Sequence, residues 1–406
     1  MRFALVSTHV DQTTGYAKVA YNLLRQVSSL TPKVKTFHFG FQRHPDRKNI
    51  RKIPDGVVAY DAAANEDPRE EGFGFNKIAE YMDMVRPDVV MIYNDPLIIC
   101  KFVEALKYDK ETSPFKLWLY VDQVYEGIAQ PLVDIMNKQA DRIYCFTQSW
   151  ADIYKSYSPN CPQPRVLEHG IDAGEFTFMS KEQRLSLRKG LKVPTDAVVF
   201  MNANRNSQRK RLDIMVMGFV KLLTMTTAPV HLLVVTAMNP QQGAYYDIQR
   251  IYLTELKRAG LAAESFSTRL MIVDTSPPNT LSDAQINELY NLSDVGLNTS
   301  DGEGFGLCQL EHLYTGAPQV VTDVGSYRAF LNDEVAYFVQ PSGVQYFSGA
   351  MPLGGSAPIF DPSVLANGML ETINTLDARK AALKSFPFKS WSKVCDGWLE
   401  DLHSVS

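Results

Sequence analysis

Short apolar runs alternate along the chain with segments whose apolar residues recur at helical spacing. The runs contain four to six residues, which is typical of buried strands, and in the first half they cover 3–7, 34–39, 57–60, 89–93, 117–121 and 143–147. Between them, segments such as 16–27 and 75–85 carry the helical pattern. This alternation predicts crossover units, in which a parallel sheet is covered by helices on both faces.

The same pattern begins again after Asp172. Further strands are predicted at 198–201, 232–236, 270–273, 295–297 and 319–322. A chain of 406 residues exceeds the size at which one hydrophobic core usually keeps growing. We therefore predict an α/β protein with two doubly wound Rossmann-like domains, at 1–172 and 173–385. Segment 342–358 contains four glycines and interrupts the pattern, so we expect an inserted surface loop there.

Composition and charge narrow the class of protein. The net charge of −4 and the hydrophobic content of 45% are ordinary for a globular protein and do not favour nucleic acid as a partner. The chain opens directly with a predicted strand and has no apolar stretch of membrane-spanning length, so we expect a cytoplasmic protein. Its five cysteines are scattered without paired spacing, which fits reduced thiols, and the histidines show no metal-binding spacing.

Two carboxylates, Glu303 and Glu311, stand eight positions apart across a glycine turn. The preceding run 294–300 is predicted to be a short buried strand, so the turn leads from a strand into a helix. Backbone N–H groups at a helix start favour an anion, and carboxylates accept hydrogen bonds from hydroxyl groups. Two helical turns place Glu311 on the same side as Glu303. A sugar joined to a phosphate, as in a nucleotide sugar, fits this combination.

The turn resembles the signature of the retaining glycosyltransferases of family 4, which have the two-domain GT-B fold with an interdomain cleft. The matching residues are Ser300, Glu303, Gly304, Phe305, Gly306, Leu307 and Glu311. The resemblance implies that Glu303 contacts the donor sugar, that the amides of the 304–307 turn meet the diphosphate, and that Glu311 holds the ribose. Segments 167–176, 315–322 and 390–394 extend it. They imply a domain crossover and a final helix, at 386–406, that returns to the first domain.

A second match follows the predicted strand 198–201, where the family carries an arginine and a lysine at the spacing of Arg205 and Lys210. A departing pyrophosphate gains negative charge, so two fixed cations would lower the barrier without a metal. The expected enzyme is a metal-independent hexosyltransferase without a cofactor. By the resemblance, it moves a sugar with retention from a UDP- or GDP-linked donor to a hydroxyl of a glycan, glycoprotein or glycolipid. The alternative is that Arg205, Arg209, Lys210 and Arg211 simply form a basic helix start.

The first half of the chain carries weaker signals. Gly15 follows the first predicted strand and could let backbone amides approach a phosphate. Family members often have a histidine after the strand equivalent to 116–121, and Asp122 stands nearest to that position. We expect Asp122 to contact the acceptor or the sugar, with a helix N-cap as the alternative. His9 is a rival candidate, although a surface or turn histidine is the simpler interpretation.

Five basic residues gather within ten positions: Arg43, Arg47, Lys48, Arg51 and Lys52. A solvated loop is the simpler expectation, and weak peripheral contact with anionic lipid is the alternative. Two other functions compete with glycosyl transfer. One is a nucleotide-sugar epimerase or hydrolase of the same fold, and the other is a sugar-nucleotide-binding protein that has lost catalysis.

Overall fold

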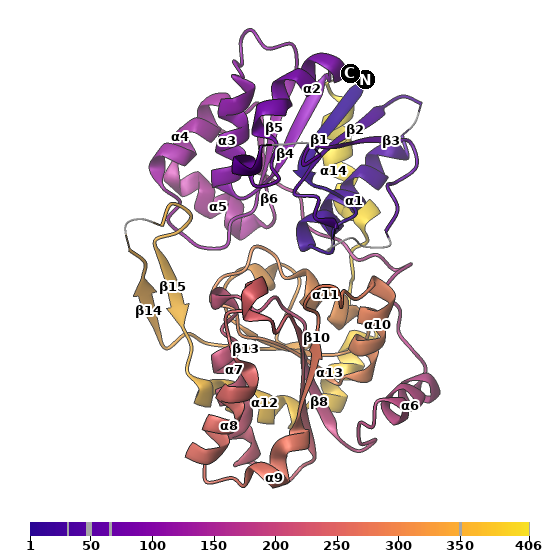
Figure 1. Cartoon of the computed structure of the whole chain (residues 1–406), viewed down its shortest axis with the longest axis vertical. Helices are drawn as coiled ribbons and strands as arrows, with labels where there is room; N and C mark the ends of the chain where they lie inside the picture. The colour runs from indigo at the N-terminus through magenta and orange to yellow at the C-terminus, as the bar shows by residue number, and fades with distance from the viewer. Residues whose placement is uncertain (31, 46–50, 65–66, 349–350, 406) are drawn as a thin grey trace. The chain divides into compact units, whose positions relative to one another are not determined.

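The chain folds into two compact units in the computed structural model (Figure 1). The structure describes residues 1–30, 32–45, 51–64, 67–348 and 351–405. The N-terminal unit comprises Met1–Gly170, Tyr346–Ser356 and Lys389–Ser406, and the C-terminal unit comprises Ile171–Gln345 and Ala357–Phe388. The chain thus passes from one unit to the other four times.

A seven-stranded parallel sheet forms the centre of the N-terminal unit within the described residues, in the order β3-β2-β1-β4-β5-β6-β7. Its strands are β1 (Arg2–Thr8), β2 (Lys35–Phe41), β3 (Val57–Asp61), β4 (Val89–Asn94), β5 (Lys116–Val121), β6 (Arg142–Cys145) and β7 (Arg165–Val166). The order reverses between β1 and β4, and at such a switch point parallel sheets bind ligands beyond the carboxyl ends of their strands.

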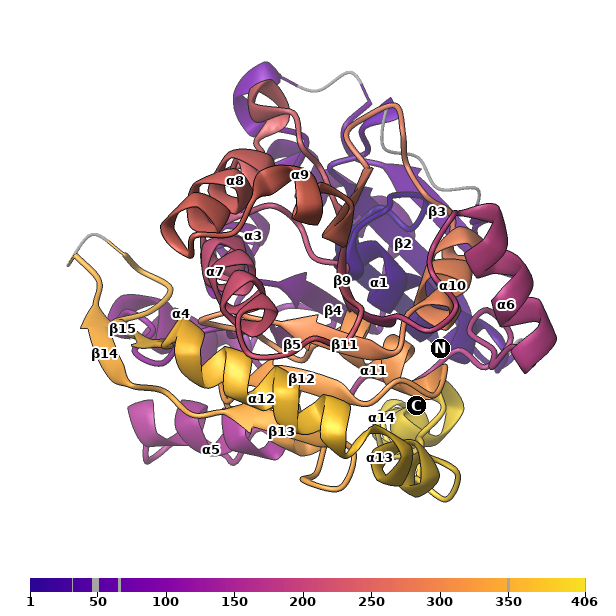
Figure 2. The ribbon, with the colours of Figure 1, turned by 90° about the horizontal axis from the view of Figure 1, so that it is seen from below.

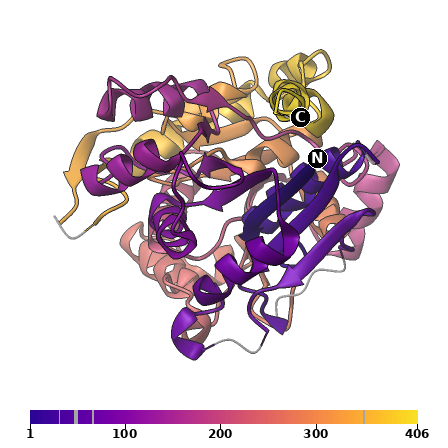
Figure 3. The same ribbon diagram turned by 90° about the horizontal axis from the view of Figure 1, so that it is seen from above.

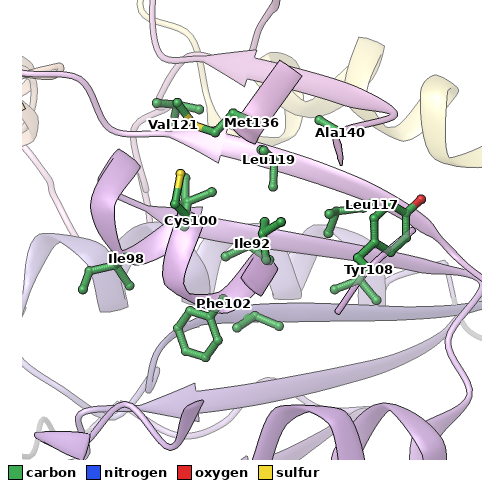
Figure 4. Packing of buried hydrophobic residues seen from close by; sticks show 14 of the residues in the cluster. Ile92, Ile98, Cys100, Phe102, Tyr108, Leu117, Leu119, Val121, Met136 and Ala140 are labelled. Atoms are coloured by element: carbon green, nitrogen blue, oxygen red, sulfur yellow. The ribbon is translucent and has the colours of Figure 1, made fainter. Parts of the chain in front are cut away.

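Helices cover both faces of this sheet. One face packs against α2 (Ile78–Val85), α3 (Pro96–Leu106), α4 (Gln130–Gln139) and α5 (Gln148–Tyr157), through apolar side chains such as Ile92, Phe102, Leu119 and Met136 (Figure 4). The other face carries α1 (Gly15–Ser28) and α14 (Trp391–His403). The Phe3 and Trp398 rings meet edge to face at 5.7 Å, so the first strand and the last helix lie side by side (Figures 1 and 3).

The C-terminal unit repeats this plan with a six-stranded parallel sheet in its described residues, in the order β10-β9-β8-β11-β12-β13. The strands are β8 (Val198–Asn202), β9 (Val230–Thr236), β10 (Leu270–Asp274), β11 (Val295–Asn298), β12 (Gln319–Thr322) and β13 (Ala336–Val339). Here the order reverses between β8 and β11, which are direct neighbours.

Helices again cover both sides of the sheet (Figure 2), and apolar side chains pack between them and the strands. One side packs against α7 (Leu212–Leu223), α8 (Ile248–Arg258) and α12 (Pro362–Asn374). The other packs against α10 (Asp283–Leu292), α11 (Leu307–Tyr314) and α13 (Leu376–Leu383). Two helices at the margins, α6 (Lys181–Gly190) and α9 (Ala263–Phe266), complete the unit. The prediction of two doubly wound Rossmann-like domains is confirmed.

Segment 342–358 differs from the expected loop. It contains a two-stranded sheet of β14 (Gly343–Tyr346) and β15 (Ser356–Ile359). The tip of this arm belongs to the N-terminal unit. There, Gly355 N donates to Glu126 O at 2.8 Å and Ala129 N donates to Pro352 O at 2.9 Å. Its glycines permit this close approach, because a Cβ at Gly354 would lie 2.5 Å from Tyr125 Cβ.

Candidate functional site

Lys210 and Glu303 meet beyond the carboxyl end of the C-terminal sheet. Lys210 lies in the loop that follows β8, and Glu303 lies in the loop that follows β11. Because β8 and β11 are parallel neighbours at the switch point, their loops leave the sheet at the same edge. The topology therefore brings together two residues that are 93 positions apart in the chain.

Backbone hydrogen bonds fix the two loops to each other. Asp301 N donates to Arg209 O at 2.9 Å. The Thr299 hydroxyl donates to the carbonyls of Lys210 and Arg211, each at 3.0 Å. Thr299 is fully buried, so these bonds are shielded from water. The arrangement holds the main chain on both sides of the ion pair in one position.

Three donors converge on one oxygen of Glu303. Lys210 Nζ forms a short hydrogen bond with Oε2, Ser300 Oγ donates to the same atom at 3.3 Å, and Arg209 Nη1 lies 3.5 Å from it. Among the described residues, no donor contacts the other oxygen, Oε1. The Glu303 side chain is 12% exposed. It thus has one oxygen anchored in the protein and a second that can accept a hydrogen bond from a ligand.

The charges of this cluster depend on one another. Burial alone would raise the pKa of Glu303, but the nearby Lys210 and Arg209 outweigh that effect and hold the pKa of the carboxyl well below its usual range. Burial lowers the pKa of Lys210, and the Glu303 carboxylate opposes that shift. Both groups are therefore ionised at neutral pH, as a buried pair.

Lys210 keeps hydrogen-bonding capacity for an anion. An ammonium group has three N–H donors, and Glu303 is the partner that the structure gives Nζ among the described residues. The Lys210 side chain is 7% exposed, so any further partner must come close to it. Arg205, the other expected phosphate ligand, lies in the same loop with an exposed side chain. Arg211 turns away from the pair and binds Asp213 at 2.9 Å.

The glycine turn has the form that the sequence predicts. Gly304, Phe305 and Gly306 are buried and Leu307 begins α11, whose N-terminus is not capped by a side chain. Gly306 has a φ of 106°, which side-chain-bearing residues rarely adopt. A Cβ there would lie 2.4 Å from the ring of Tyr327. The turn can thus hold only glycine at this position without rearrangement.

Glu311 lies deeper than Glu303. It is 3% exposed, and the Tyr290 hydroxyl donates to its Oε2 at 3.3 Å. Glu311 lies within α11, and the glycine turn directly precedes that helix, as the sequence predicts. The structure therefore leaves Glu311 little open surface for a ribose, and that role stays a prediction.

In the N-terminal unit, Asp122 directly follows β5 and accepts a hydrogen bond from Tyr16 Oη at 2.5 Å. Gly15 starts α1, is exposed, and has open space where a Cβ would project. The alternative of a helix N-cap for Asp122 is wrong, because the next helix, α4, begins only at Gln130. Asp122 instead lies at the carboxyl end of β5, where it contacts the first turn of α1.

His9 differs from the expectation of a surface residue. It is 2% exposed, and its Nδ1 lies 2.7 Å from Asp11 Oδ1. Asp11 also accepts from Arg43 Nε at 2.8 Å, and Arg43 reaches Asp61 at 2.9 Å. Arg43 is thereby half-buried in ion pairs, whereas Arg47 and Lys48 of the basic group lie outside the described residues. Weak membrane contact by this group stays a prediction.

Sequence reasoning did not single out several residues of the site. Arg209 is one of four basic residues within 205–211, and nothing in the sequence distinguishes the tyrosines at 16, 290 and 327. Each tyrosine contacts its partner across a large separation in the chain, for example 106 positions between Tyr16 and Asp122. Only Arg209 had a local signal, because it directly precedes Lys210 and a helix start disfavours cations.

The described residues contain neither a candidate metal site nor a candidate membrane-spanning helix. No group of three or more histidine, cysteine, aspartate or glutamate side chains there could hold a metal ion. Metal independence nevertheless stays a prediction. No helix in the described ranges is both long and apolar enough to cross a membrane. No disulfide joins the five cysteines, all of which lie in the described ranges; four of them are buried and Cys308 is partly exposed.

No known family model matches the chain. Among curated proteins, the D-inositol 3-phosphate glycosyltransferase of Saccharomonospora viridis is 27% identical over 205 residues. The matching region covers 50% of this chain and 44% of that relative, so the match spans less than half of the relative's length.

Solved structures match over the whole chain. Sucrose-phosphate synthase from Thermosynechococcus elongatus has a TM-score of 0.73 at 15% identity, and each chain is covered completely. HepE from Anabaena, in complex with UDP and glucose, has a TM-score of 0.69 at 14% identity, again with complete coverage of both chains. At these identities the likeness concerns the fold. The protein therefore has the fold of GT-B glycosyltransferases, with two Rossmann-like domains.

Proposed function

We propose that this protein is a glycosyltransferase that moves a sugar from a nucleotide-sugar donor to a hydroxyl group of an acceptor. The proposal rests mainly on Glu303, whose Oε2 is anchored by Lys210, Arg209 and Ser300 while Oε1 has no partner among the described residues. A carboxylate held in this way can bind a sugar hydroxyl. The adjacent ammonium can bind a phosphate.

The roles of the individual residues follow from this arrangement. Glu303 orients the donor sugar, and Lys210 with Arg205 binds the diphosphate. The backbone of the 304–307 turn approaches the same phosphates at the start of α11. Glu311 holds the ribose, and Asp122 contacts the acceptor. The similarity to a structure with bound UDP and glucose supports a UDP-linked sugar as the first donor to test.

We propose transfer with retention at the anomeric carbon and without a metal. The bond from the anomeric carbon to the phosphate oxygen breaks, and a bond from that carbon to the acceptor oxygen forms on the same face. The departing phosphate takes the acceptor's proton, so no carboxylate nucleophile is required. Lys210 lowers the barrier because negative charge on the leaving diphosphate increases as the first bond breaks. Acceptors are glycans, glycoproteins or glycolipids.

The test is a transfer assay with UDP-, GDP- and ADP-linked sugars against a panel of acceptors, with EDTA in half of the reactions. The wild-type protein should form glycosylated product with α configuration from an α-linked donor, and EDTA should leave the rate unchanged. Nucleoside diphosphate released equally without acceptor would indicate a hydrolase, and an isomerised donor would indicate an epimerase. Donor binding without any turnover would indicate a binding protein.

Lys210→Met tests the assignment of the phosphate ligand. Hydrogen bonds to charged groups contribute about 1.5–3 kcal/mol, so turnover should fall about tenfold to a hundredfold. Lys221→Met is the matched control, because Lys221 is an exposed lysine of α7. Thermal unfolding of both variants shows whether the loss reflects the reaction or the fold. Unchanged transfer by Lys210→Met would refute the assignment.

A further inference from the structure

Arg209 and Lys210 both contact Glu303, but the proposed function gives Arg209 no role in binding the donor. Its Nη1 donates to Gly302 O at 2.6 Å and lies 3.5 Å from Glu303 Oε2. The Arg209 side chain is 23% exposed, compared with 7% for Lys210. Two cations of different accessibility therefore face one carboxylate oxygen.

Donor binding creates a conflict for Lys210. In this structure its ammonium neutralises Glu303, and although the ammonium has further N–H donors, the proposed function requires its single positive charge to serve both the carboxylate and the diphosphate. As Lys210 turns toward the phosphate, Glu303 loses its nearest positive charge while a second anion approaches it. Both changes favour protonation of a carboxylate. A protonated Glu303 would bind the sugar hydroxyls less strongly, because charged acceptors form the stronger hydrogen bonds.

Arg209 is placed to resolve this conflict. Its main-chain carbonyl is fixed by Asp301 N, and its guanidinium is held by the carbonyl of Gly302, which is uncharged. These contacts do not involve Lys210 and do not depend on a phosphate. Arginine also stays protonated at any pH at which an enzyme works. Arg209 can thus remain beside Glu303 whatever Lys210 does.

We propose that Arg209 is a positioning residue that keeps Glu303 ionised, with Oε1 directed outward, when Lys210 exchanges the carboxylate for the donor diphosphate. This inference rests on the proposed function. No proton is transferred in the exchange. A Lys210 N–H leaves Glu303 Oε2 for a phosphate oxygen, and Arg209 continues to balance the charge of the carboxylate. Lys210 is suited to the exchange because its stem is flexible while the backbone around it is fixed.

The experiment measures transfer across pH 4–9 in the wild type, Arg209→Gln, Arg209→Lys and Arg211→Gln. Arg211→Gln is the matched control, since it removes the same charge from the next residue, whose side chain binds Asp213. In Arg209→Gln, the acid limb of kcat should move upward by about one pH unit, because a nearby opposite charge lowers a carboxylate's pKa by one to three units. At neutral pH kcat should fall more than the donor KM rises.

Arg209→Lys should restore the acid limb toward that of the wild type, and Arg211→Gln should leave it in place. A role confined to holding the fold would lower the unfolding temperature without moving the pH profile. Should Arg209→Gln not fold, Arg209→Met fills a similar volume and gives the same readout. An acid limb that is identical in the wild type and the uncharged variants would overturn this inference alone. A wild type that neither binds nor turns over any donor would overturn it together with the proposed function.

Discussion

Tyr16 Oη donates a hydrogen bond to Asp122 Oδ2 at 2.5 Å, which joins the first turn of α1 to the end of β5. Tyr16 also packs against the Tyr93 ring at a centroid distance of 5.2 Å. Asp122, nearby Asp95 and burial all raise the pKa of Tyr16, with burial as the largest cause. The phenol therefore stays protonated and serves as a donor that fixes Asp122.

Variants at Asp122 and Tyr16 should distinguish the effect of the carboxylate's charge from the effect of its orientation. Asp122→Asn should lower kcat/KM for the acceptor about tenfold to a hundredfold and leave donor binding unchanged, since a charged hydrogen bond contributes about 1.5–3 kcal/mol. Tyr16→Phe keeps the carboxylate and removes one hydrogen bond to it, so a smaller loss is expected. Steady-state kinetics with the acceptor varied provide the measurement. Equal losses in donor affinity would show that Asp122 does not serve the acceptor.

Gly306 should not tolerate a side chain. In Gly306→Ala, the Cβ meets the Tyr327 ring at 2.4 Å and the residue must also adopt a positive φ, so we expect donor affinity to fall at least tenfold. Gly325→Ala provides the control, because Gly325 has a φ of 82° but nothing within 4 Å of a Cβ. Gly325→Ala therefore has the strained positive φ but no steric clash of its Cβ. Calorimetric titration with the donor compares the two, and similar affinities would contradict the prediction.

Asp294 should make the protein sensitive to acid. Burial would raise its pKa, but Arg184, Lys380 and Arg188 overcome that effect and lower the pKa of Asp294 to about 2 from an ordinary 3.8. Because the folded pKa is depressed, this stabilisation is present above pH 3.8 and is lost as the pH falls toward 2. Across that interval the wild type should lose about 2 kcal/mol of unfolding free energy that Asp294→Asn does not lose.

Urea unfolding at several pH values measures this difference. At neutral pH, Asp294→Asn should be less stable by about 3 kcal/mol, because it leaves buried cations without their anion. Asp396→Asn is a suitable control, since Asp396 is about half exposed and forms its ion pair with Lys393, three positions earlier in the same helix. Parallel pH profiles for the wild type and Asp294→Asn would show that Asp294 does not carry the acid sensitivity.

The arm at 343–359 should depend on one of two adjacent glycines. Gly354→Ala places a Cβ 2.5 Å from Tyr125, whereas in Gly355→Ala the nearest atoms lie at 4.0 Å. Overpacking of this kind costs about 1–3 kcal/mol, so the first variant should loosen the arm and the second should not. Limited proteolysis can follow cleavage within 346–356. Equal rates for both variants would show that this contact does not hold the arm.

Some features of this protein follow from local pattern. The strands at 89–93 and 198–201 are visible in the sequence because continuous apolar runs of that length suit buried parallel strands. The glycine turn at 303–307 is visible too, because its position between a strand and a helix and its residue types depend on neighbours in the chain. Both inferences need only short-range information.

Other features depend on contacts across the chain. The positive charge of Arg209, Lys210 and Arg211 does not tell which partner each one binds. The fold directs Lys210 to Glu303, Arg209 to both Gly302 and Glu303, and Arg211 to Asp213. Likewise, His9 is buried against Asp11, which its position at a strand end did not reveal. The direction of each side chain is set by the turn at 208–211 and by the neighbouring loop.

The sequence by itself therefore determined the two parallel-sheet domains and the segment that carries the candidate donor site, because apolar periodicity and turn chemistry act over a few residues. Only the tertiary structure decided which oxygen of Glu303 is anchored and which remains open. It also decided that Tyr16 orients Asp122 and that the arm packs on residues 125–129. These outcomes depend on strand order, which brings loops that are far apart in the chain to one edge of a sheet. A pattern of neighbouring residues does not specify which distant loops will meet.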